Sequence, residues 1–174
     1  DVAALAADLP TDKFLDYALR QTVFALKPHW LPALRAGQLQ LAQHPARMAM
    51  LVRADGTADV RQSLRALLAE PATDRAARET YWRILADVGS TNDLAALLQI
   101  QDTALLAKLL PALGTSARAR QLRPAGDLVA TLRPMLSSGD EKLRAESLRL
   151  VGLWSLSSLS SLAHAAALDS KAPE

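Results

Sequence analysis

Apolar residues recur along almost the whole chain at the spacing of an α-helix, and a glycine, a proline or a helix-capping residue interrupts them every 12–18 residues. Leu15, Leu19 and Val23, for example, lie one turn apart. Leucine and alanine dominate the sequence, and Ile84 and Ile100 are the only isoleucines, so few β-branched aliphatic side chains are left to form strands. The pattern therefore predicts an all-α protein without a β-sheet.

The capping residues and breakers place the boundaries of the expected helices. Thr11 or Asp12 is expected to cap the first helix and Asn92 or Asp93 a short one, and Gly114 is expected to end a helix before a small basic helix around Arg118. The helices themselves are expected at 14–26, 30–34, 45–52, 60–68, 77–88, 94–98, 105–113, 127–136, 143–154 and 159–168. Residues 169–174 are expected to form a frayed tail.

The helix starts also follow a regular rhythm. The first helices of successive pairs are expected near Asp12, Pro45, Asp74, Thr103 and Asp140, at intervals of 33, 29, 29 and 37 residues. A two-helix unit repeated at such spacing is typical of an α-solenoid, because stacked pairs share a core that one pair cannot form alone. A compact bundle is the alternative, but it needs fewer and longer helices. The expected repeats span residues 11–37, 45–69, 73–101, 103–137 and 140–168 within a single domain, 1–174.

Two segments resemble a known repeat. Residues 140–152 (DEKLRAESLRLVG) are similar to the first helix of a HEAT repeat, and so is 74–78 (DRAAR) taken with 85–89 (LADVG). Such repeats place an aspartate at the cap and an arginine one turn later. The resemblance implies a right-handed α-solenoid of HEAT-like antiparallel helix pairs.

A second resemblance is narrower. Residues 12–19 (DKFLDYAL) and 27–37 (KPHWLPALRAG) are similar to the helical-repeat region of large bacterial proteins that resemble membrane-bound dehydrogenases. In those proteins a β-propeller precedes the repeats and a c-type haem domain follows them. The resemblance implies a periplasmic or extracytoplasmic accessory domain of a redox enzyme. Because this chain has no haem-attachment motif, the redox chemistry itself would lie outside it.

The residues that usually carry chemistry are sparse. The chain has no cysteine, which excludes thiol nucleophiles, disulfides and cysteine-based zinc sites within it. His29, His44 and His164 are far apart in the sequence and have no acidic partner at a metal-ligand spacing, so we expect no metal site and no cofactor. Asp12 and Asp16 lie one turn apart at an expected helix start, where a negative charge interacts favourably with the helix dipole.

No phosphate-binding glycine loop and no Gly-x-Ser-x-Gly motif is present. The carboxylates Glu141 and Glu146 form a second close pair, and the serines between Ser155 and Ser161 alternate with leucines, which is typical of a helix face.

The tryptophans lie at core-like positions and are expected to fill gaps between repeats. We further expect Leu64, Trp82, Leu85, Leu148 and Val151 to be buried between helices.

Arginine is the most informative polar residue, since 15 arginines accompany only five lysines. Arg118, Arg120 and Arg123, here called the arginine cluster, occur where no acidic residue lies between Thr115 and Gly126. Planar guanidinium groups suit the recognition of carboxylates and phosphates. We therefore take the arginine cluster as the candidate partner-binding site. A second basic group is interspersed with acidic residues and is expected to be a solvated, ion-paired face; it comprises Arg61, Arg65, Arg75, Arg78 and Arg83.

These observations favour a non-catalytic helical-repeat module for protein–protein interaction or scaffolding, with a protein partner or neighbouring domains of one parent chain. A nucleic-acid-binding solenoid is an alternative, but the net charge is only +2 and the charges are mixed. An accessory domain of a redox enzyme is the other alternative. No apolar run is long enough to span a membrane. The chain begins with Asp1 rather than Met, and we expect it to be part of a longer protein.

Overall fold

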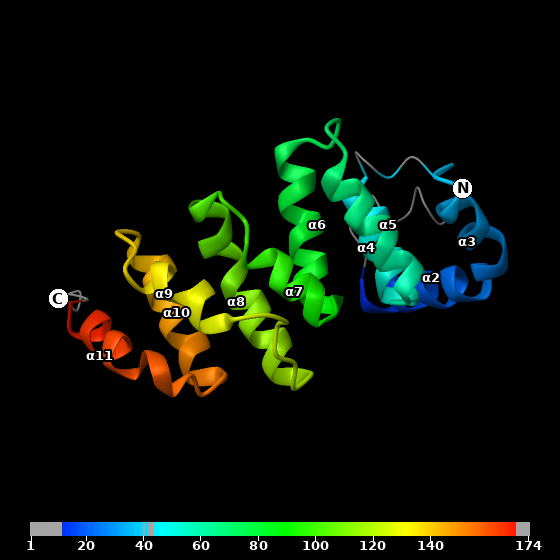
Figure 1. Ribbon diagram of the computed structural model, residues 1–174. Helices are drawn as coiled ribbons and strands as arrows, with labels where there is room; N and C mark the ends of the chain where they lie inside the picture. Colours follow the sequence, from blue (N-terminus) through cyan, green and yellow to red (C-terminus); the bar gives the residue numbers. More distant parts are fainter. Residues whose placement is uncertain (1–11, 40, 42–43, 170–174) are drawn as a thin grey trace. The chain divides into compact units, whose positions relative to one another are not determined.

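The computed structural model describes residues 12–39, 41 and 44–169, and within them the fold is entirely helical (Figure 1). Ten α-helices and one short 3-10 helix account for the regular structure, and no strand occurs in these residues. This confirms the all-α prediction. The expected frayed tail begins at Asp169, the last residue of a helix, and its other residues lie outside the described part of the chain. No helix in the described residues is long and apolar enough to cross a membrane.

The helices divide between two compact units, Asp1–Val88 and Gly89–Glu174. The first unit contains α2 (Lys13–Ala25), α3 (Lys27–Arg35), α4 (Pro45–Ala54), α5 (Ala58–Ala69) and α6 (Arg75–Val88). The second contains α7 (Thr91–Leu97), α8 (Thr103–Ala119), α9 (Leu128–Leu136), α10 (Glu141–Leu153), η1 (Ser157–Leu159) and α11 (Ser160–Asp169). The expected arrangement of all helices in one solenoid domain stays a prediction.

In the first unit, α4 packs on α2, α5 and α6, and α5 also packs on α3. Leu64 on α5 and Tyr81 on α6 are fully buried in the shared core, together with Met48 on α4. The Tyr81 hydroxyl donates a hydrogen bond to the Leu41 carbonyl oxygen. Burial of the phenol raises the pKa of Tyr81 to about 12, and the nearby Asp74 carboxylate adds to this effect.

In the second unit, α10 is the central helix and packs on α8, α9 and α11. Leu113 on α8 and Leu132 on α9 are fully buried. At the end of α10, the Trp154 indole Nε1–H donates to the Leu122 carbonyl oxygen at 3.3 Å.

Aspartates begin several helices as the sequence predicts. The Asp12 carboxylate accepts backbone N–H groups at the start of α2, and the Asp127 and Asp140 carboxylates do the same for α9 and α10. The expected cap of α7 is wrong. Ser90 is the N-cap, and Asp93 lies three residues later, where its carboxylate accepts the Ser90 N–H at 2.7 Å in a capping box.

The expected end of a helix at Gly114 is also wrong, because α8 continues to Ala119 and includes the segment expected to form a separate basic helix. Gly114 serves helix packing. A Cβ atom placed there would lie 3.3 Å from Leu150 Cδ2 on α10, so glycine permits the close approach of the two helices. Beyond the C-cap residue Arg120, Gln121 adopts the left-handed region at φ 53°, and the Leu122 N–H donates to the Ala117 carbonyl oxygen.

Three of the five residues expected in the core, Leu64, Leu85 and Val151, are buried. Leu148 and Trp82 are only half-buried, so for these two the expectation is wrong. On α10 the centre of the buried face is Ser147, whose hydroxyl donates to the Leu143 carbonyl oxygen at 2.7 Å. Leu148 therefore lies at the edge of this face.

Candidate functional site

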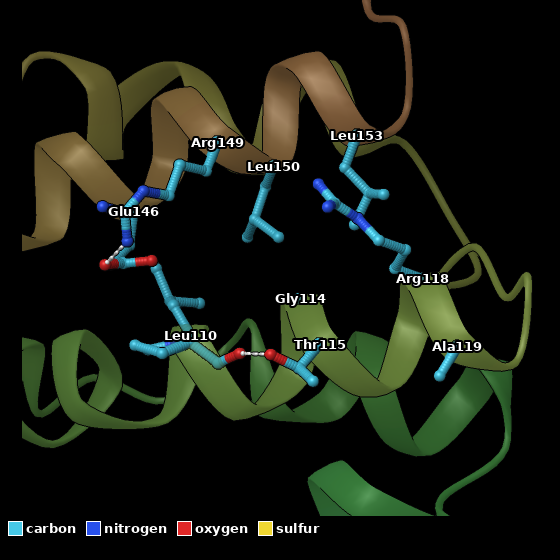
Figure 2. A pocket seen from close by; sticks show the side chains of 10 residues that line it. Leu110, Gly114, Thr115, Arg118, Ala119, Glu146, Arg149, Leu150 and Leu153 are labelled. Atoms are coloured by element: carbon cyan, nitrogen blue, oxygen red, sulfur yellow. Dashed lines mark hydrogen bonds and ion pairs between the residues drawn. The ribbon is translucent and has the colours of Figure 1, made fainter.

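A groove with a volume of about 410 Å³ lies between α8 and α10 in the second unit (Figure 2). Both walls come from continuous helices that pack directly on each other. The lining residues are Leu110, Pro111, Gly114, Thr115, Arg118 and Ala119 from α8 and Glu146, Arg149, Leu150 and Leu153 from α10.

The floor of the groove is apolar and firmly fixed. Leu110 is 1% exposed and Leu150 is 2% exposed, and they extend toward each other from opposite helices in Figure 2. Gly114, one turn after Leu110 on α8, faces Leu150 and has no side chain to fill the space. The floor is therefore set by core packing, and the apolar surface that a ligand side chain could reach comes from Pro111 and Leu153 beside it.

The charged residues lie at the two ends of this floor. At one end the buried Glu146 carboxylate accepts a hydrogen bond from Arg149 Nη1 at 2.6 Å. At the other end Arg118 extends beside Leu153 (Figure 2). Among the residues that the structure describes, none forms a hydrogen bond or an ion pair with the exposed Arg118 guanidinium group. This cation is thus available to an external carboxylate.

The three members of the arginine cluster have different environments. Arg120 is half-buried, and its guanidinium donates to the Ser116 hydroxyl at 3.0 Å and to the Gly89 carbonyl oxygen at 2.7 Å. Arg123 is exposed beyond the end of α8 and does not line the groove. Only Arg118 joins the groove, so these residues do not converge on one concave site.

The sequence-predicted carboxylate pairs have structural partners. Asp16 forms ion pairs with Arg20 at 3.1 Å and Arg53 at 3.4 Å. The Asp12 carboxylate caps α2, and Glu146 pairs with Arg149 as described above. Glu141 lies in the first turn of α10. Neither predicted pair therefore forms an open two-carboxylate site.

The histidines remain separate from one another. His29 and His164 are exposed, and His44 precedes α4. In the described residues no three histidine, cysteine, aspartate or glutamate side chains gather closely enough to hold a metal ion.

The second basic group is tied to its surroundings. Arg83 pairs with Glu79 at 3.5 Å, Arg61 donates to the Gly56 carbonyl oxygen at 2.5 Å and Arg78 to a backbone carbonyl at the end of α5. Elsewhere on this unit Arg35 on α3 donates to Asp59 on α5 at 2.6 Å. This hydrogen bond holds the pKa of Asp59 below its ordinary value.

Sequence reasoning missed most of the groove. Leu110, Gly114 and Leu150 were expected only as helix or boundary residues, and Glu146 as part of a carboxylate pair. An end of α8 at Gly114 would have removed one wall. The signal that could have identified the longer α8 is the apolar periodicity that continues past Gly114 through Ala117.

Comparison with known proteins gives no relative: no family model, no curated protein and no solved structure matches this chain. The assignment of function therefore depends on the chemistry of the chain itself.

Proposed function

We propose that this chain is a non-catalytic helical-repeat module for protein–protein interaction, built as an α-solenoid of HEAT-like helix pairs. The regular rhythm of helix starts supports the repeat, since stacked pairs present more continuous surface than a globule of the same length. The observation that carries the proposal is the α8–α10 groove, with its apolar floor and the available guanidinium group of Arg118.

The groove suits a protein segment that carries an apolar side chain beside a carboxylate. The apolar side chain would cover the accessible Pro111 and Leu153 beside the buried floor, and the carboxylate would accept hydrogen bonds from Arg118. A polyanion fits less well. The buried Glu146 carboxylate lies at the other end of the groove, only Arg118 offers a cation without an internal partner there, and nucleic-acid affinity depends on several phosphate contacts made together.

The test is photo-crosslinking in cells that make the protein. A photoreactive phenylalanine analogue at Thr115, an exposed position on the groove, is compared with the same analogue at Arg123. We expect a discrete protein adduct from the Thr115 position that disappears when Arg118→Glu is added. A further chain with the analogue at Thr115 and Arg123→Glu is the control, since it has the same net charge but an intact groove.

The two variants separate the possible outcomes. An adduct that survives Arg118→Glu contradicts a role for the groove. If Arg123→Glu removes the adduct as completely as Arg118→Glu does, the binding site is the whole arginine cluster, as the sequence predicts. A crosslink to RNA or DNA in place of protein would favour the nucleic-acid alternative.

A further inference from the structure

A second surface, on α2 in the first unit, exposes aromatic side chains along one stripe. Phe14 is 74% exposed, Tyr17 60% and Phe24 58%. Together with the exposed Gln21 they are spaced three, four and three residues apart, which places all four on one side of the helix. We call this stripe the aromatic face of α2.

The exposure is concentrated rather than scattered. Of the six large hydrophobic side chains that are exposed in the described residues, five lie on α2 or at its C-cap, and Leu168 on α11 is the other. Because each aromatic side chain has roughly 150–250 Å² of surface, the three rings leave on the order of 400 Å² exposed to solvent. Patches of that size are among the largest on soluble monomers and commonly mark interaction sites.

Cations border the aromatic face. A hollow of about 300 Å³ beside it is lined by Tyr17, Arg20, Gln21, Phe24, Arg53 and Ala54, so that α2 and α4 both contribute. Arg20 and Arg53 share one carboxylate, that of Asp16, and Lys13 Nζ lies 5.0 Å from the centre of the Phe14 ring.

The shared Asp16 carboxylate accepts from only some of the N–H donors of the two guanidinium groups. Each guanidinium has five N–H donors, and Asp16 accepts from one nitrogen of each. The Arg20 Nε atom is buried and has no hydrogen-bond partner, while the Arg53 side chain is 63% exposed. Beside the aromatic face there are thus three cations, Lys13, Arg20 and Arg53, and the carboxylates of Asp16 and of the capping residue Asp12. The complementary ligand is apolar on one side and carries carboxylates at its border.

We propose that the aromatic face of α2, with Arg20 and Arg53, binds an acidic amphipathic helix of a protein partner. The stripe from Phe14 to Phe24 extends about 15 Å, which matches about three turns of a helix that presents apolar residues at successive turns. The partner's carboxylates pair with Arg20 and Arg53. The central Asp16 carboxylate disfavours a continuous polyanion such as RNA, whereas a peptide can place its carboxylates on either side of it. This surface is independent of the α8–α10 groove.

The experiment measures fluorescence anisotropy of two labelled peptides with the full 174-residue chain. Both peptides are helical, about five turns long, with leucines on one face; one carries glutamates at the flanking positions and the other lysines. We expect the glutamate peptide to bind and the lysine peptide to bind about tenfold or more weakly. Phe24→Ser and Tyr17→Ser should each weaken the glutamate peptide about tenfold, since truncating a central aromatic anchor removes much of the binding energy.

Matched variants keep the test independent of folding. All the substituted side chains are exposed, so circular dichroism should be unchanged, and Leu168→Ser removes an equally exposed hydrophobic residue from α11 without affecting binding. Arg53→Glu should reverse the preference between the two peptides. Arg118→Glu should leave the binding unchanged, which separates this proposal from the groove.

Several results would overturn the assignment. These are glutamate-peptide binding that is unaffected by Phe24→Ser, equal binding of both peptides, and tighter binding of single-stranded RNA that depends on the same residues. Self-association in sedimentation equilibrium that Phe24→Ser abolishes would make a second copy the occupant. Binding of the glutamate peptide only after removal of residues 1–11 would make that segment the occupant.

Discussion

Ionisation of Tyr81 gives this protein a defined loss of stability at alkaline pH. The side chain is fully buried, and its pKa is raised to about 12, whereas an unfolded tyrosine titrates near pH 10. Below pH 10 both states keep the proton and stability does not depend on this group. Between pH 10 and 12 the unfolded state releases the proton and the folded state retains it, so the free energy of unfolding falls as pH rises. Since one pKa unit corresponds to about 1.4 kcal/mol, the total loss is on the order of 2–3 kcal/mol.

The assay is urea unfolding at a series of pH values from 8 to 12, combined with the near-ultraviolet absorbance of tyrosinate. The chain has two tyrosines and no cysteine, so in a Tyr17→Phe background the tyrosinate absorbance reports Tyr81 alone. Tyr81→Phe should lose most of the alkaline destabilisation. It should also be about 1 kcal/mol less stable at pH 8, because the hydrogen bond to the Leu41 carbonyl is lost. A Tyr81→Phe protein with the same pH dependence as the wild type would refute the reasoning.

Three further predictions concern stability, measured by urea unfolding. Leu113→Ala on α8 should cost about 2–5 kcal/mol because the side chain is fully buried, and Leu148→Ala on α10 should cost distinctly less because that side chain is half-buried. The reverse order would contradict the position of Leu148 at the edge of the buried face of α10. Asp140→Ala should cost about 1 kcal/mol through loss of the α10 cap, and Asp140→Asn should restore most of it. Arg120→Ala should cost about 1–3 kcal/mol because it leaves a backbone carbonyl unpaired, whereas Arg118→Ala should be nearly neutral; equal effects would mean that Arg118 is also structural.

The sequence predicted helix starts better than helix ends. Asp12, one of two expected caps, and Asp140 begin their helices where the sequence predicts, because a capping carboxylate acts on N–H groups only two or three residues away. The end of α8 could not be predicted in the same way. The left-handed residue after this helix is Gln121 rather than a glycine. Gly114 resembles a stop signal in the sequence, but a glycine is needed there because Leu150 of α10 packs closely against it.

The candidate site depends even more on contacts between distant residues. Arg118, Arg120 and Arg123 are equivalent in the sequence, where all that distinguishes them is their order. In the structure one lines a groove, one holds a backbone carbonyl and one is exposed. These roles follow from the continuation of α8 and from the packing of α10 against it. Leu150 lies 24 residues after Gly126, the last residue of the acid-free stretch that defines the cluster. The aromatic face of α2 escaped prediction because an apolar stripe on one helix is ordinarily a core face.

The three tryptophans provide optical labels for the two units. Trp30 and Trp82 belong to the first unit and Trp154 is the only one in the second. The indole groups of Trp30 and Trp154 donate to backbone carbonyl oxygens, at 2.6 Å and 3.3 Å, so their emission is sensitive to loss of the native surroundings. A chain with Trp30→Phe and Trp82→Phe reports the melting of the second unit alone, and Trp154→Phe reports the first. The fluorescence of two variants can therefore follow each unit through denaturation without any added dye.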